Sequence, residues 1–127
     1  MNDVFGISYN YDQEADVLYI SFSPGEKAST AVELNENILL RFNRGERRAI
    51  GLTLMDFSML VQLTRLGPRA FPLTGLSDLE PEWQEIVIEM IMSPPVNQIL
   101  RVSTYTPAYA EAVPVAAVER PPIFVNA

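Results

Sequence analysis

Apolar and polar residues alternate along the first half of the chain, a pattern typical of half-buried β-strands. In residues 17–23, Leu18, Ile20 and Phe22 fall on one side and polar residues mostly on the other. Residues 30–34, 38–42 and 50–54 share the pattern, and turn sequences such as Ser-Pro-Gly-Glu lie between strands. We therefore expect four antiparallel strands joined in chain order by tight turns as a meander, with residues 5–9 as a fifth strand.

A second pattern, with apolar residues three and four positions apart, covers residues 81–92 and predicts a helix. The apolar stripe consists of Trp83, Ile86, Val87, Met90 and Ile91. We expect this stripe to cover the apolar face of the sheet, because a sheet with one apolar face must bury it. Residues 56–66 predict a shorter helix, residues 67–78 a loop, and residues 99–104 a further strand.

The chain changes character after residue 105, where prolines interrupt small and apolar residues. This composition predicts an extended tail without a core of its own. The expected organisation is one α+β domain, residues 1–105, followed by an extended proline-rich tail, residues 106–127. The domain is an antiparallel β-meander of four to five strands with one or two helices packed on one face.

Composition narrows the chemistry that this acidic protein can perform. The 127 residues include nine basic and sixteen acidic residues, for a net charge of −7, and neither cysteine nor histidine. Thiolate nucleophiles, Ser-His-Asp relays, Cys/His zinc sites and histidine bases are therefore excluded. The glycines are scattered, so no phosphate loop is formed, and Lys27 stands in a turn. We expect no enzymatic activity, no catalytic residue, no cofactor and no metal.

Charge and hydropathy also bear on partners and location. No apolar stretch approaches the ~20 residues of a membrane span, and the first residues lack the features of a signal peptide. We expect a cytoplasmic protein without a membrane or nucleic-acid partner, since net negative charge repels both nucleic acid and anionic lipid. The same charge favours a basic protein partner.

Two polar clusters each allow a functional and a purely structural interpretation. Asp12, Glu14 and Asp16 lack the glycine and glutamate that an EF-hand loop needs, which leaves either a weak cation site or a turn with solvated carboxylates. Four arginines cluster in eight positions: Arg41, Arg44, Arg47 and Arg48. They indicate either a patch for an anion, RNA or an acidic partner, or a solvated hairpin tip that keeps a sheet edge from pairing.

Two apolar pairs extend the candidate interaction surface. Ile88 and Met92 lie beside the main helix stripe, so another segment of this chain, a partner or a second protomer is expected to cover them. Ile123 and Phe124 in the proline-rich tail either dock on another chain, pack on their own domain or stay unstructured.

Residues 11–20 carry a resemblance to a known family. The sequence reads Tyr11-Asp12, then Asp16-Val17-Leu18-Tyr19-Ile20, and later Ile50-Gly51-Leu52. Over about residues 9–60 the chain resembles a small uncharacterised bacterial family, domain of unknown function 2283. The resemblance implies a small meander with a helix against it and no settled activity, and some relatives resemble partners of small toxin-like proteins.

These observations favour a small non-catalytic module that binds a protein partner or itself, as a homo-oligomer, through its sheet, helix and tail. An antitoxin-like neutraliser of a basic toxin is the alternative, because the acidic charge suits a basic partner. A carboxylate-based cation-binding protein that uses Asp12, Glu14 and Asp16 is a remote third hypothesis.

Overall fold

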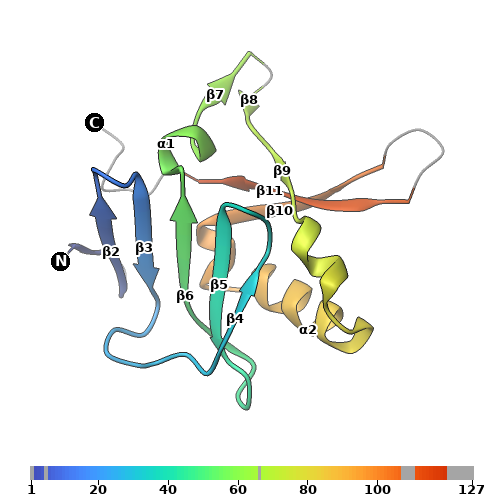
Figure 1. Ribbon diagram of the computed structural model, residues 1–127, viewed down its shortest axis with the longest axis horizontal. Helices are drawn as coiled ribbons and strands as arrows, with labels where there is room; N and C mark the ends of the chain where they lie inside the picture. Colours follow the sequence, from blue (N-terminus) through green and yellow to red (C-terminus); the bar gives the residue numbers. More distant parts are fainter. Residues whose placement is uncertain (1, 5, 66, 107–110, 120–127) are drawn as a thin grey trace.

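The computed structural model describes residues 2–4, 6–65, 67–106 and 111–119 (Figure 1). Its first half forms a six-stranded antiparallel sheet with the order β1-β2-β3-β6-β5-β4. The strands are β1 (Asn2–Val4), β2 (Ile7–Asp12), β3 (Val17–Ser21), β4 (Thr30–Glu33), β5 (Ile38–Asn43) and β6 (Arg48–Met55). The expected α+β fold with an antiparallel meander is confirmed, since β4, β5 and β6 follow one another as neighbours.

The second half supplies helices and two small sheets. Its helical segments are α1 (Phe57–Leu60), η1 (Thr74–Asp78), α2 (Pro81–Ile91) and η2 (Val96–Gln98). A two-stranded sheet pairs β7 (Leu63–Thr64) with β8 (Gly67–Pro68), and a three-stranded sheet has the order β10-β11-β9, from β10 (Leu100–Tyr105), β11 (Val113–Val118) and β9 (Phe71–Pro72). None of the helices in the described segments is long and apolar enough to span a bilayer.

The connection between β3 and β4 differs from the expected tight turn. Residues 22–29 carry the chain from β3, inside the sheet, to β4 at its edge, and β3 pairs with β6 instead. The four strands β3 to β6 therefore have Greek-key order, with three hairpin-connected strands and one that joins by a longer connection. Turn chemistry at Pro24-Gly25 specifies a bend, but it does not specify which strand the chain pairs with afterwards.

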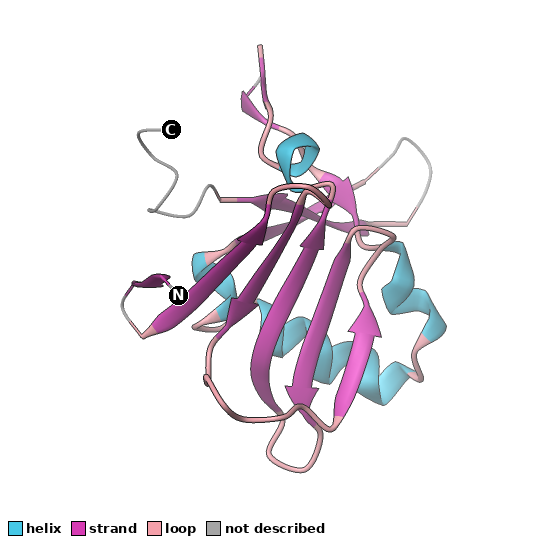
Figure 2. Ribbon diagram, turned by 60° about the vertical axis from the view of Figure 1, so that its left-hand side comes forward, coloured by secondary structure: helices cyan, strands magenta, loops and turns pink. Residues whose placement is uncertain are grey.

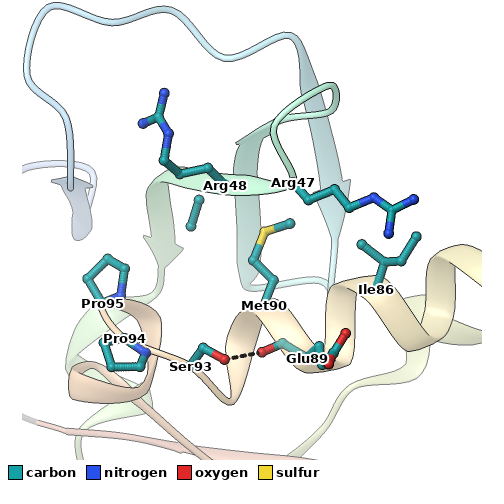
Figure 3. A pocket seen from close by; sticks show the side chains of 9 residues that line it. Arg47, Arg48, Ile86, Glu89, Met90, Ser93, Pro94 and Pro95 are labelled. Carbon is teal, nitrogen blue, oxygen red and sulfur yellow. Dashed lines mark hydrogen bonds between the residues drawn. The ribbon is translucent and has the colours of Figure 1, made fainter.

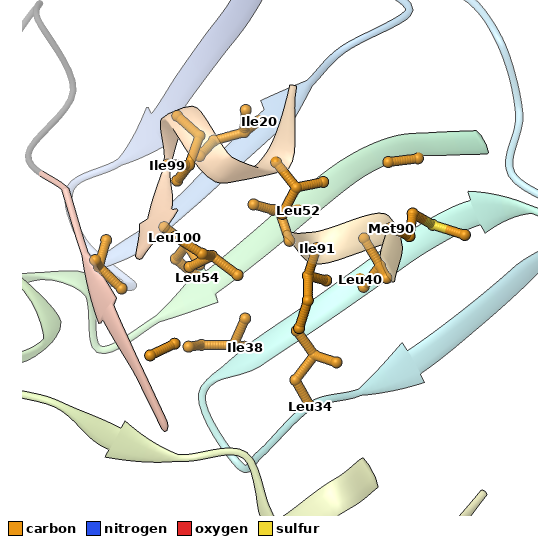
Figure 4. Packing of buried hydrophobic residues seen from close by; sticks show 14 of the residues in the cluster. Ile20, Leu34, Ile38, Leu40, Leu52, Leu54, Met90, Ile91, Ile99 and Leu100 are labelled. Carbon is orange, nitrogen blue, oxygen red and sulfur yellow. The ribbon is translucent and has the colours of Figure 1, made fainter. Parts of the chain in front are cut away.

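The α2 helix confirms the expected cover of the sheet. Figure 2 shows the helix behind one face of the six-stranded sheet, and no helix or strand of the described residues lies over the other face. Val87 and Ile91 are completely buried, and Ile86 and Met90 nearly so, in one cluster with Ile20, Leu40 and Leu52 of the sheet (Figure 4). Each such side chain contributes roughly 1.5–3 kcal/mol of transfer free energy, so the helix face is a major source of stability.

The segment between β6 and α2 is built differently from the expectation. Residues 56–66 contain only one helical turn, α1, before the chain turns into β7 and β8. Residues 67–78 are not all loop, because Phe71–Pro72 pairs with β11 and Thr74–Asp78 is a 3₁₀ helix. Leu73 and Leu76 from this segment are buried, so its prolines and glycines shape a packed connection.

The expected tail, residues 106–127, includes a folded segment, because residues 113–118 are part of the domain. As β11, they lie between β10 and β9, and Val115, Ala116 and Val118 are buried. Pro114 is tolerated although it cannot donate a ladder hydrogen bond, and its own carbonyl accepts one from the Leu73 amide at 2.9 Å. The expected tail residues 107–110 and 120–127 lie outside the described residues.

Candidate interaction surfaces

The face of the six-stranded sheet that points away from α2, called here the open face, carries three rows of side chains. Strand register sets the rows, because residues opposite each other across neighbouring strands point to the same side. The middle row is Asn10, Tyr19, Thr53, Leu39 and Glu33, in order from β2 to β4. Asp12, Val17 and Met55 form the row at one end, and Ser8, Ser21, Gly51, Arg41 and Ala31 form the row at the other.

The open face mixes exposed or half-buried apolar side chains with polar ones. The Tyr19 side chain is 43% exposed, and Val17 and Met55 in the neighbouring row are half-buried. Leu39, also half-buried, is separated from Tyr19 by Thr53 of β6. Asn10, Asp12 and Glu33 at the sides are exposed.

Arg41 lies flat across the open face because Gly51 has no side chain. A β-carbon at Gly51 would lie 2.3 Å from Nη2 of Arg41 and 2.5 Å from the Ile20 carbonyl oxygen. The guanidinium occupies this space, and its Nη2 donates a hydrogen bond to the same carbonyl at 3.2 Å. Its Nε is buried and has no hydrogen-bond partner. Arg41 is thus held in one orientation with an unsatisfied buried donor.

Arg48, at the start of β6, is neutralised within the chain. Its Nη2 lies 2.6 Å from a carboxylate oxygen of Glu26 and 2.6 Å from one of Glu46. Donation by Arg48 is the main cause that lowers the pKa of Glu26 from its ordinary value, and a hydrogen bond from the Ser23 hydroxyl adds to the effect. This ion pair ties the connection 22–29 to the β5–β6 hairpin.

Arg44 belongs to the helix side of the sheet. Its guanidinium carbon lies 4.1 Å from the centroid of the Trp83 ring, a cation–π contact. The Trp83 ring in turn lies 5.9 Å from the ring of Phe42, between centroids. The expected packing of Trp83 on the sheet is therefore observed, with Arg44 covering the outer part of the indole.

Arg47 lines a cavity between the hairpin and the end of α2. The cavity has a volume of about 300 Å³, and Figure 3 shows Arg47 and Arg48 above an apolar floor that includes Ile86 and Met90. Glu89, Ser93, Pro94 and Pro95 complete the wall with Ala49. Arg47 has no ion-pair partner within the described part of the chain, so this cavity presents one available cation beside apolar side chains.

The four arginines therefore do not make one basic patch. Arg41 is on the open face, Arg44 on a tryptophan, Arg48 in an ion pair, and Arg47 on a separate cavity. Spacing in sequence cannot reveal this division, because each side chain's partner comes from a distant segment. An isolated glycine inside a predicted strand is a signal of close backbone approach, and at Gly51 it points to the site that sequence reasoning missed.

The acidic residues 12–16 close a turn. The Asp16 carboxylate accepts hydrogen bonds from the Tyr11 hydroxyl at 2.7 Å and from the amide and hydroxyl of Ser58. Asp12 accepts one from the amide of Ala15 at 3.1 Å. Within the described segments, no three or more acidic side chains come close enough to hold a metal ion.

The two apolar pairs have different positions. Ile88 is half-buried against the core, whereas Met92, which follows the last turn of α2, is 56% exposed. Ile88 is therefore covered by other residues of this chain. Met92 remains a candidate residue for contact with a partner. Ile123 and Phe124 lie outside the described residues, so their expected docking stays a prediction.

Comparison with known proteins identifies one part of the chain. No curated protein and no solved structure matches this protein significantly. Residues 8–58 match the model of a family described as a protein of unknown function, DUF2283. The matched segment runs from β2 to α1, and it includes the open face with Tyr19, Arg41 and Gly51. The resemblance seen in the sequence is therefore confirmed over residues 8–58.

Proposed function

We propose that this protein is a non-catalytic interaction module that pairs with a second copy of itself through the open face. The observation that carries the proposal is Tyr19, which is 43% exposed on a face that no described helix or strand covers, whereas α2 covers the opposite face. Exposed apolar patches with polar rims mark interaction sites, because their burial removes apolar surface from water.

The middle row of the open face favours a second copy as the partner. From β2 to β4 the row reads polar, apolar, Thr53, apolar, polar, so it is symmetric in character about Thr53. A twofold axis that runs along β6 in the interface places Tyr19 over Leu39 of the second copy and Asn10 over Glu33, each contact twice. A symmetric contact requires such a self-complementary surface.

Light scattering coupled to size-exclusion chromatography tests the proposal. We expect a mass of twice 14.2 kDa for the protein and dissociation of the dimer by Tyr19→Ser. The substitution removes two central tyrosines from each dimer, so the dissociation constant should rise by about 30-fold or more. The matched control is Tyr105→Ser, which removes an equally apolar side chain, 60% exposed, from β10 of the other sheet.

Two results would contradict the proposal. One is a monomer for the unmodified protein at concentrations of about 100 μM, well above the dissociation constant of a functional dimer. The other is a dimer that Tyr105→Ser dissociates and Tyr19→Ser leaves intact, which would place the interface on β10. Circular dichroism of both variants verifies that neither change acts by unfolding.

A second candidate is an antitoxin-like neutraliser of a basic protein. The observation that favours it is the acidic side of α2, where Glu82, Glu85 and Glu89 are all exposed. The net charge of the whole chain is −7. Such a surface attracts a basic partner at long range. This candidate requires an adjacent gene for a small basic protein whose toxicity is relieved, and which co-purifies, on co-expression; absence of such a gene, or failure of both rescue and co-purification, would remove the candidate. In either role we expect the protein to act in the cytoplasm.

A further inference from the structure

We propose that Arg41 and Lys27 form a binding site for an oxyanion, a carboxylate or phosphate group, at the β4 end of the open face. The site is a groove of about 500 Å³ lined by residues 26–31 and Arg41. It is separate from the cavity at Arg47. The twofold axis proposed above places Ser21 of the second copy over Arg41, so dimer formation and ligand binding compete for this end of the open face.

Arg41 is the strongest reason to assign a ligand to this groove. Among the described residues, one of its three guanidinium nitrogens, Nη2, has an observed acceptor, the Ile20 carbonyl oxygen, and Nε is buried without one. A buried N–H without an acceptor is rare in folded proteins. Nη1 also has no acceptor among the described residues, and an oxyanion in the groove supplies one of the kind that arginine binds most strongly.

The sheet register leaves Arg41 without a carboxylate. Its neighbours across the strands are Ala31 on β4 and Gly51 on β6, neither of which has a polar side chain. Arg48 on the same hairpin shows the opposite arrangement, with Glu26 and Glu46 both at 2.6 Å. The chain thus neutralises one arginine of this region and leaves the other charged and positioned.

Lys27 adds a second positive charge at the rim of the groove. It is exposed, it is the chain's single lysine, and it has no ion-pair partner within the described residues. The carboxylate that lines the same groove, Glu26, is held by Arg48 and by the Ser23 hydroxyl, so it is directed to other partners. Two unpaired cations at one groove create a local field that favours an anion despite the net negative charge of the chain.

Gly51 makes this arrangement possible. Only a residue without a β-carbon lets the guanidinium lie against β6 and reach the carbonyl of β3. The orientation of Arg41 is therefore fixed before a ligand arrives, which reduces the entropy lost on binding. Fixed orientation together with an unsatisfied donor distinguishes Arg41 from a solvated surface arginine.

Nitrogen-15 NMR of the labelled full-length protein tests the site directly. The Nε–Hε signal of Arg41, identified by its loss in Arg41→Lys, is followed as sodium phosphate or sodium acetate replaces sodium chloride at constant ionic strength. We expect a saturable shift of this signal and of the backbone amides of residues 28–31. The phosphate and acetate arms show which oxyanion binds more tightly.

Matched variants separate a specific site from general charge effects. Arg41→Lys should weaken binding about tenfold, because lysine cannot present the planar fork of donors. Lys27→Gln should weaken it about threefold to tenfold through the lost charge. Arg65→Gln removes the same charge from the exposed β7–β8 turn and should leave binding unchanged.

The proposal is overturned if neither anion gives a saturable shift at Arg41, or if Lys27→Gln binds phosphate as tightly as the unmodified protein. Lys27 is exposed, so that variant is expected to fold and keeps the test decisive even if Arg41→Lys is unstable. The titrations are repeated on Tyr19→Ser, in which a second copy does not cover the groove, so the oxyanion site is tested whether or not the unmodified protein forms a dimer.

Discussion

Gly51→Ala is the substitution that most directly tests how the open face is built. The added β-carbon would lie 2.3 Å from Nη2 of Arg41, 2.9 Å from its Cζ, and 2.5 Å from the Ile20 carbonyl oxygen. The guanidinium can swing away, but the carbonyl is part of the backbone of β3 and cannot move without distorting the β3–β6 pairing. The substitution should therefore cost stability even after the arginine has moved.

The expected magnitude combines three contributions. Overpacking against backbone costs about 1–3 kcal/mol. Loss of the hydrogen bond from charged Arg41 to Ile20 costs about 1.5–3 kcal/mol. Replacement of glycine by alanine within a strand raises the free energy of unfolding by about 0.5–1 kcal/mol, because it reduces the entropy of the unfolded chain. The net decrease in the free energy of unfolding should be about 1.5–5.5 kcal/mol.

Urea denaturation followed by fluorescence of the single tryptophan measures this decrease. The midpoint should fall while the slope with urea stays unchanged, as expected for a change in the folded state alone. Gly45→Ala is the matched control, because a β-carbon there has only one neighbour within 4 Å, the Asn43 side chain at an ordinary 3.6 Å. A Gly51→Ala protein within about 0.5 kcal/mol of the Gly45→Ala protein would refute the reasoning.

Three further predictions concern the core and the Asp16 turn. Ile91→Ala should lower the free energy of unfolding by about 2–5 kcal/mol in a urea titration, because the side chain is completely buried, whereas exposed Glu85→Ala should change it by less than about 0.5 kcal/mol. Deletion of residues 113–127 should abolish cooperative thermal unfolding, because β11 is the central strand of its sheet and part of the core; an unchanged melting curve would contradict its burial. Hydrogen bonds from Tyr11 and Ser58 lower the pKa of Asp16 from its ordinary value, so its contribution to stability is full above the unfolded-state pKa, about 4, and is lost as the pH falls through the folded-state pKa; Asp16→Asn should reduce the loss of urea stability below about pH 4, and an unaltered pH profile would count against this role.

Local patterns predict the strands and the long helix well, because each depends on one periodicity. Strands β3, β4, β5 and β6 and helix α2 lie close to their predicted bounds. The strand order was wrong at β3, since period-two alternation specifies which side of a strand is apolar and not which strand lies next to it. The prolines of residues 106–127 predict a tail that includes 113–118, whereas the structure accommodates the one proline of that segment, Pro114, within β11.

The candidate sites were predicted only in part, for a related reason. The four arginines were recognised as a cluster, but their partners come from β3, from the connection 22–29 and from α2. Tyr19 was placed on the side opposite Leu18 and Ile20, and no sequence signal stated that this side stays uncovered. What turns a residue into part of a surface is the position of distant segments, which periodicity does not encode.

The two faces of the sheet differ in what covers them. Leu18, Leu40 and Leu52 on the packed face lie within the matched residues 8–58, but α2, η2, β10 and β11, which cover them, lie outside that match. A sheet with so large an apolar face needs cover to be stable in water, so the second half of the chain acts as structural support. The open face lies within the matched segment and has no cover within the described chain. The core does not require an exposed Tyr19, a positioned Arg41 or a glycine that admits it, and their presence on the open face is the argument on which the proposed binding role rests.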